Sequence, residues 1–93
     1  MRIITRQIAA AFNAEKSLKV GNTKTDGQAV FLHGNKIVER RSDGVYATLA
    51  GWNTPTTRER VNGVTGARFH CVKHEAHLNG MPVGDSDWIK VSN

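Results

Sequence analysis

The stretch Ala-Val-Phe-Leu-His-Gly-Asn-Lys-Ile-Val-Glu-Arg, residues 29–40, decides the fold. Its first half is a short, largely apolar run that ends at turn residues, a pattern typical of a central β-strand. Gly34 and Asn35 predict a two-residue turn, of type II′ because glycine comes first. The chain should then return through residues 36–40, so the stretch predicts an antiparallel hairpin.

The segments on either side of this hairpin predict one more strand each. Asp43 and Gly44 form the next turn signal, and alternating apolar residues over 45–49 indicate a third antiparallel strand that ends near Gly51. On the N-terminal side, residues 17–20 alternate like a short strand, and residues 21–28 are expected to form a loop.

Two segments have helical patterns. Over residues 3–14, Ile4, Ile8 and Phe12 recur at helical spacing, which predicts an amphipathic N-terminal helix. A short second helix is expected in the middle segment. It starts either with Thr54 as the cap and proline at the first helical position, or with Thr56 in a capping box with the glutamate at 59. Gly63 is expected to end it.

The C-terminal third predicts a second hairpin. Residues 68–78 are long enough for a strand, Asn79-Gly80 is a turn signal, and a short return ends at residues 88–91, with Trp88 in the core. The fold class is therefore α+β: an N-terminal helix packed on an antiparallel sheet of about five to six strands, with a short second helix. Residues 1–93 are expected to form a single domain.

Composition limits the function without naming it. Thirteen Lys plus Arg face eight Asp plus Glu, a net charge of +5 that favours polyanions or acidic protein surfaces as partners. Cys71 is the only cysteine, so no internal disulfide forms, and a reducing cytoplasm fits best. No run approaches the roughly 18 apolar residues of a membrane span, and Arg6 interrupts the one stretch that resembles a secretory signal. We expect no membrane partner.

The segment from His70 to His77 gathers three histidines and the one thiol. On a helix, His70, His74 and His77 would share a face. As a strand, His70 and His74 share one face while Cys71 and His77 take the other. A structural zinc site needs about four convergent ligands, so the strand reading favours surface histidines, and we expect no metal and no cofactor. No nucleophile or phosphate-loop motif is present, which favours a protein that is not an enzyme.

Basic residues near the first hairpin and the second helix are the leading binding candidates. If the short helix packs beside the hairpin, they form one basic face, and arginine suits phosphate through its rigid fork of donors. A neighbouring tryptophan can stack on a base. The alternative is a solvated face with scattered ion pairs. The candidate nucleic-acid-binding residues are Lys36, Arg40, Arg41, Trp52, Arg58 and Arg60.

Several short phrases are similar to a group of small proteins, without an assigned activity, encoded by tailed bacteriophages and prophages. They are Gly21-Asn22-Thr23, Leu32 to Ile37, Gly51-Trp52, Thr56 to Asn62, and Leu78-Asn79-Gly80 with the following Trp88. The resemblance implies a viral protein that acts in the host bacterial cytoplasm, and it carries over no catalytic residue. The histidines before Leu78 depart from the pattern of this group.

These observations leave different functions open. The leading hypothesis is a small non-enzymatic phage accessory protein that binds nucleic acid through its basic face. The alternative is a host-takeover or counter-defence protein that docks the same face on an acidic surface of a bacterial protein. A minor component of the virion is a third hypothesis. The sequence does not predict an oligomeric state.

Overall fold

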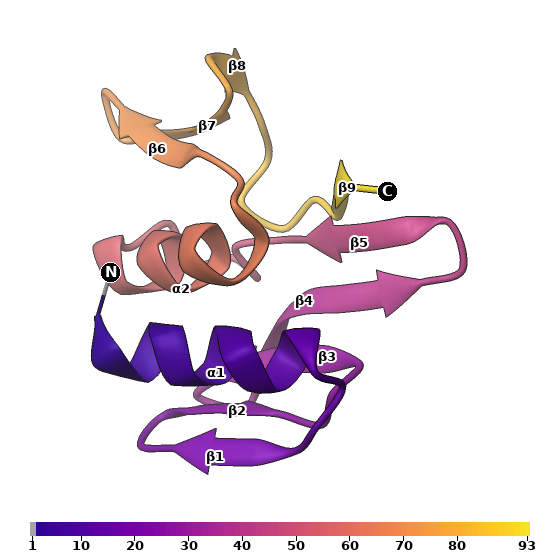
Figure 1. Ribbon diagram of the computed structural model, residues 1–93. Helices are drawn as coiled ribbons and strands as arrows, with labels where there is room; N and C mark the ends of the chain where they lie inside the picture. Colours follow the sequence, from indigo (N-terminus) through magenta and orange to yellow (C-terminus); the bar gives the residue numbers. More distant parts are fainter. Residues whose placement is uncertain (1) are drawn as a thin grey trace.

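The computed structural model describes residues 2–93, which form two helices and two antiparallel sheets (Figure 1). The larger sheet has six strands in the order β1-β2-β3-β4-β5-β9, and the smaller has three in the order β6-β7-β8. The elements are α1 (Ile3–Asn13), β1 (Leu18–Val20), β2 (Thr23–Thr25), β3 (Ala29–Leu32), β4 (Asn35–Arg41), β5 (Gly44–Ala47), α2 (Pro55–Thr65), β6 (Phe69–Val72), β7 (Glu75–Leu78), β8 (Met81–Pro82) and β9 (Ile89–Ser92). The predicted α+β class is confirmed.

Helix α1 lies across β1, β2 and β3, as the helical spacing of its apolar residues predicts. Ile8 and Phe12 are buried on the side that faces the sheet. The last turn contains no basic residue of its own. Arg40 of β4 supplies the positive charge there, because its Nη2 donates a hydrogen bond to the carbonyl oxygen of Phe12 over 2.8 Å.

The central hairpin forms, but its turn differs from the prediction. Strand β4 begins at Asn35, and the turn residues are His33 and Gly34, with φ angles of 51° and 82°. Two successive positive φ angles are typical of type I′, not type II′. The register also shifts beyond Val30, so that Ile37 is an extra residue without a partner on β3.

Strand β2 was missed because its inward side chains are polar. Thr23 and Thr25 are buried, while Lys24 between them is exposed, so no apolar alternation marks the strand. Hydrogen bonds satisfy both hydroxyls: Thr25 Oγ1 donates to the Ala29 carbonyl over 2.7 Å, and Thr23 Oγ1 accepts from Arg60 over 3.0 Å. The segment predicted as a loop is therefore a strand of the sheet.

Helix α2 uses Thr54 as its cap and runs beyond the predicted end. The Thr54 hydroxyl accepts a hydrogen bond from the backbone N–H of Thr57 over 3.2 Å. The helix passes through Gly63 and ends at Thr65, and the capping residue Gly66 has a left-handed φ of 78°. The additional turn buries Val64, which offsets the low helix propensity of glycine.

The C-terminal third differs most from the expectation. Lys73 and His74 form a turn with φ angles of 49° and 69°, which splits the predicted long strand into β6 and β7. The turn at Asn79-Gly80 is confirmed and leads to the short β8. The last strand, β9, does not complete a second hairpin, because it pairs with β5 at the edge of the large sheet. Trp88 is 36% exposed, so its assignment to the core was wrong.

The core lies between the helices and the inner face of the large sheet. The small sheet packs against α2 through β6 and adds Phe69, Ala76 and Leu78 to the core. Because both helices bury their apolar sides against the inner face, the opposite face of the large sheet carries neither described helix. The buried apolar residues are Ile8, Phe12, Val30, Leu32, Ile37, Val38, Ala47, Leu49, Val61, Val64, Phe69, Ala76 and Leu78.

Candidate nucleic-acid interface

The face of the large sheet that points away from the helices, here called the outer face, carries cations and aromatic rings side by side. Cross-strand partners in a sheet share a face. Lys19 of β1 lies opposite Lys24 of β2, Lys24 lies opposite Phe31 of β3, and Phe31 lies opposite Lys36 of β4. Adjacent strands are about 4.8 Å apart, so this row crosses about 14 Å of the sheet.

Phe31 is the centre of this row. The ammonium nitrogens of Lys24 and Lys36 lie 5.2 Å and 5.9 Å from the centroid of its ring, which is within the range of cation–π attraction. The extra residue in β4 keeps the row intact: by taking up one position, Ile37 leaves Lys36 on the outer face while Val38 points into the core.

A second cluster lies toward the other edge of the outer face. Tyr46 of β5 is the cross-strand partner of Glu39 on one side and of Lys90 on the other. The guanidinium carbon of Arg41 lies 4.1 Å from the centroid of the Tyr46 ring and 5.4 Å from that of Trp88. An arginine and two aromatic rings therefore form a stacked group next to Lys90.

Carboxylates reduce the positive charge of the outer face without cancelling it. Glu39 Oε2 lies 2.7 Å from Arg41 Nε, and Glu39 Oε1 lies 3.2 Å from Lys36 Nζ. The hydrogen bonds from these two side chains hold the pKa of Glu39 below its ordinary value, so Glu39 is ionised at neutral pH. Asp43, in the β4–β5 turn, accepts a hydrogen bond from the Tyr46 hydroxyl over 2.7 Å. The cations of the face are Lys19, Lys24, Lys36, Arg41 and Lys90.

The structure does not bring the six residues singled out from the sequence onto one face. Lys36 and Arg41 lie on the outer face, in the clusters described above. Arg40, between them in β4, points to the opposite side of the sheet, where its guanidinium lies 4.2 Å from the centroid of the Phe12 ring. Alternation along the strand separates Arg40 from Arg41.

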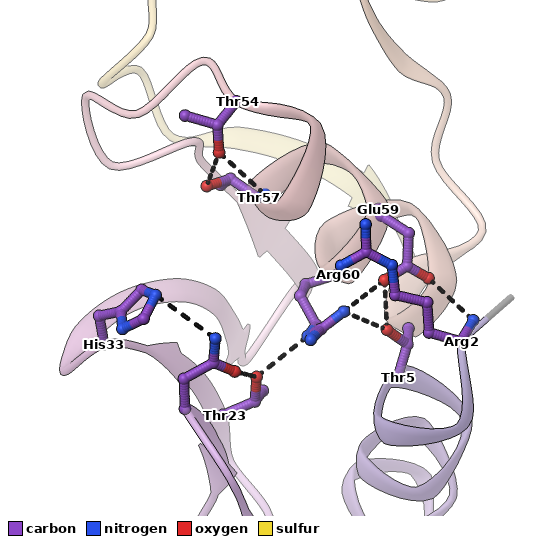
Figure 2. A network of polar contacts seen from close by, with 9 residues as sticks. Arg2, Thr5, Thr23, His33, Thr54, Thr57, Glu59 and Arg60 are labelled. Atoms are coloured by element: carbon purple, nitrogen blue, oxygen red, sulfur yellow. Dashed lines mark hydrogen bonds and ion pairs between the residues drawn. The ribbon is translucent and has the colours of Figure 1, made fainter.

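Arg60 is inside the protein, with a side chain that is 3% exposed. Figure 2 shows its guanidinium between α1 and β2. Nη1 donates to Thr5 Oγ1 over 2.9 Å and contacts Glu59 Oε1 at 2.5 Å, and Nε donates to Thr23 Oγ1 over 3.0 Å. Arg60 therefore ties the two helices to the sheet, and its guanidinium does not reach the surface.

Arg58 and Trp52 lie in two further places. Arg58 is half-buried and contacts Asn53 Oδ1 through Nη1 at 2.5 Å. It borders a shallow hollow shared with His70 and Cys71 of the small sheet. Trp52 is 59% exposed and lines a different cavity, next to the β3–β4 turn. The expected convergence of the basic side chains of the hairpin and α2 is not observed.

Sequence reasoning missed most of the outer face. The register of five strands, including β2 in the segment expected to be a loop, places five further residues on this face: Lys19, Lys24, Phe31, Tyr46 and Lys90. The signal within the sequence is the exposed residue between two inward ones, as for Lys24 between Thr23 and Thr25. That signal is weak when the inward residues are threonines.

The segment from His70 to His77 lies in the β6–β7 hairpin of the small sheet. His70 and His77 are cross-strand partners, and their rings stack with centroids 5.5 Å apart. His74 lies in the turn, so the expected sharing of one face by His70 and His74 is not observed. Within residues 2–93, no three His, Cys, Asp or Glu side chains gather as metal ligands would.

A family model described as the Kyanoviridae Gp96 protein matches residues 1–89. The chain belongs to this family. The resemblance to small bacteriophage proteins is thereby confirmed at the level of a phage protein family, whose description names no catalytic activity. No curated protein and no solved structure matches the chain significantly. Neither helix of this Gp96 family member has the length and apolar character needed to cross a membrane, within the residues that the structure describes.

Proposed function

We propose that this member of the Gp96 family is a non-enzymatic protein of the infected host cytoplasm that binds single-stranded nucleic acid on the outer face. The observation that carries the proposal is the row Lys19, Lys24, Phe31 and Lys36, in which a partly exposed ring lies between cations across four neighbouring strands. Aromatic side chains stack with unpaired bases, and cations beside them pair with the phosphates.

The like charges in the row support an anionic partner. Lys19 and Lys24 are direct cross-strand partners, and like charges in this position destabilise a sheet. A phosphate placed between the two ammonium groups removes that repulsion. Among the described residues, the ammonium groups of Lys24 and Lys36 contact the Phe31 ring, and that of Lys36 also pairs with Glu39. A base that stacks on Phe31 frees them to contact the backbone on either side.

The aromatic rings of the outer face favour a single strand over a duplex. A single strand can lay its bases on exposed rings, whereas a duplex hides the faces of its bases in its own stack. Phe31, Tyr46 and Trp88 are all at least partly exposed on this face. A duplex would contact the lysines but leave the rings without a partner.

The experiment is a fluorescence-anisotropy titration of a labelled oligonucleotide of about 12 nucleotides, within the range of about 4–16 nucleotides of small single-strand sites. At about 50 mM salt, where phosphate contacts are strongest, the protein should bind DNA or RNA single strands more tightly than a duplex of the same length. The Lys24→Ala/Lys36→Ala variant should bind more weakly, with a salt dependence reduced by up to about 0.7 per lost phosphate contact.

The matched control removes the same charge from a different surface. Arg68 and Lys73 are exposed at the small sheet, away from the outer face. Arg68→Ala/Lys73→Ala should keep most of the affinity. Equal losses in the two double variants would mean that net charge alone attracts the nucleic acid. Absence of binding at low salt would overturn the proposal and leave the acidic surface of a host protein as the partner to test, by pull-down from nuclease-treated lysate.

A further inference from the structure

A cavity of about 610 Å³ opens between the β3–β4 turn and the start of α2. Its volume is within the range of about 300–1,000 Å³ that is typical of small-molecule sites. The buried side chains of Leu32, Ile37 and Leu49 form an apolar floor. Trp52, 59% exposed, forms one wall, and its indole therefore has a free surface for a second flat ring.

The rim of the cavity is polar but carries almost no charge. Amide and hydroxyl groups line it, and among its described lining residues His33 is the only one with a titratable side chain. The amides are those of Asn22 and Asn35, and the hydroxyls are those of Thr54 and Thr56, with the buried Thr57 hydroxyl hydrogen-bonded to that of Thr54 behind them. Neutral donors and acceptors around an apolar floor fit a flat, neutral, polar-edged group better than they fit a phosphate, which would select arginine or lysine.

The cavity adjoins a hollow that reaches the outer face at the β3–β4 turn. Asn22 and His33 line both this cavity and a smaller hollow of about 300 Å³, whose other lining residues include Lys19, Lys24 and Phe31. A strand that crosses Phe31 therefore meets the cavity directly beyond the ledge formed by Asn22 and His33.

The ledge is held in place from two directions. The backbone N–H of His33 donates to the Asn22 carbonyl over 2.8 Å, and Asn22 Nδ2 lies 3.4 Å from His33 Nε2. Thr23 Oγ1 donates to Asn22 Oδ1 over 2.8 Å and accepts from the buried Arg60, and Figure 2 shows Thr23 and Arg60 together with His33, Thr54 and Thr57. Both sides of the cavity are thus fixed before a ligand arrives, which lowers the entropic cost of binding.

We propose that this cavity receives one unpaired nucleobase of the strand bound on the outer face, with its ring stacked on Trp52 and its edge hydrogen-bonded to the amides and hydroxyls of the rim. The proposal rests on the proposed function and adds a base-reading site to it. The lysine and aromatic row supplies affinity for any sequence. The cavity supplies the dependence on the base, because its polar groups must be matched by the edge of the ring.

The test uses the fluorescence of Trp52 by itself. The chain has two tryptophans, so Trp88→Phe leaves Trp52 as the only one. An oligonucleotide with bases and an abasic one of equal length and charge are titrated in turn, with binding followed in parallel by anisotropy of a label. We expect quenching and a spectral shift of Trp52 with the base-carrying strand and little change with the abasic strand at equal saturation.

A second variant measures how much Trp52 contributes to the binding affinity. Trp52→Ala should lower the affinity for the base-carrying strand about 5- to 150-fold, the range of one lost stacking contact, and barely change the affinity for the abasic strand. Trp52→Phe should retain most of the preference. Because Trp52 is largely exposed, the melting temperature should remain close to that of the parent protein.

The outcomes separate the two proposals. If the base-carrying strand binds but Trp52 is unchanged, or if Trp52→Ala weakens both strands equally, the base site is overturned and the outer face remains as the binding surface. If neither strand binds in the anisotropy measurement, the proposed function fails, and the base site fails with it.

Discussion

Arg60 of α2 donates a hydrogen bond through Nε to Thr23 Oγ1 of β2, 3.0 Å away, and so connects residues that are 37 positions apart in the chain. Thr57, Arg60, Val61 and Val64 are the buried residues of α2, at the spacing of one helical face. Arg60 therefore belongs to the packed side of its helix. A residue that looks in the sequence like part of a basic surface is a structural tie between three elements.

Loss of the Arg60 guanidinium should destabilise the fold severely. Arg60→Met leaves Glu59, Thr5 and Thr23 without their common donor, and each lost hydrogen bond to a charged group costs about 1.5–3 kcal/mol. The free energy of unfolding from urea titration measures this. Should Arg60→Met fail to fold, Arg60→Lys, which keeps the charge but loses the fork, is expected to fold with a smaller loss. A loss below about 0.5 kcal/mol in Arg60→Met would contradict the assigned role.

The carboxylate of Glu59 should make stability depend on pH. Burial raises its pKa, but hydrogen bonds from Thr5, the Arg2 backbone N–H and Arg60 outweigh burial and hold the pKa below the ordinary value of 4.5. Its contribution to the free energy of unfolding is therefore complete above pH 4.5 and is lost as the pH falls through the lower pKa of the folded state.

Comparison with Glu59→Gln isolates this contribution. The difference in the free energy of unfolding between the two proteins should be constant around neutral pH and should shrink below pH 4.5, measured by denaturant titration at a series of pH values. A difference that stays constant throughout the acid range would show that the carboxylate of Glu59 is not held in its ionised form by its neighbours.

Arg40 and Arg41 are neighbours in β4 with opposite tasks. Arg40→Ala removes the hydrogen bond to the Phe12 carbonyl and the packing on the Phe12 ring, so it should lower the free energy of unfolding by about 1–3 kcal/mol and leave nucleic-acid affinity unchanged. Arg41→Ala, on the outer face, should do the reverse. Thermal melts and anisotropy titrations of both variants provide the comparison, and the same pattern in the two would refute the division.

Glu39→Gln should strengthen nucleic-acid binding. Its carboxylate pairs with Lys36 and Arg41 on the outer face and so competes with a phosphate for both. Its removal should raise the affinity about two- to fivefold, the scale of exposed charge interactions. Glu75→Gln on the small sheet changes the net charge equally and should give a smaller gain. Equal gains would indicate that only overall charge matters.

The sequence predicted the elements that carry an apolar signal and missed those that do not. The central hairpin and α1 follow from the runs at 29–38 and 3–12, because their inward residues are apolar. Strand β2 presents threonines to the core, so its residues lack apolar alternation and its sequence predicts a loop. The split between β6 and β7 depends on left-handed backbone at Lys73 and His74, residues without the glycine that usually marks such a turn.

The candidate site depended on facts that are not local in the sequence. The side on which a strand residue lies depends on register, and the unpaired Ile37 decides that Lys36 and Glu39 share the outer face. Arg60 had a detectable signal, since it is one residue before Val61 and four before Val64 on a helix. The positive charge of Arg60 predicts a surface position, whereas its spacing from Val61 and Val64 predicts the buried side of the helix, where it lies.

The most direct measurement is a ¹⁵N–¹H NMR titration of the isotope-labelled protein with a single-stranded oligonucleotide, in which each backbone amide reports its own surroundings. The account predicts the largest shifts at Lys19, Lys24, Phe31 and Lys36, with weaker ones around Tyr46, and little change in β6, β7 and β8. Shifts confined to the small sheet, or around Arg58 and the outer side of α2, would contradict the assignment of the outer face as the binding surface.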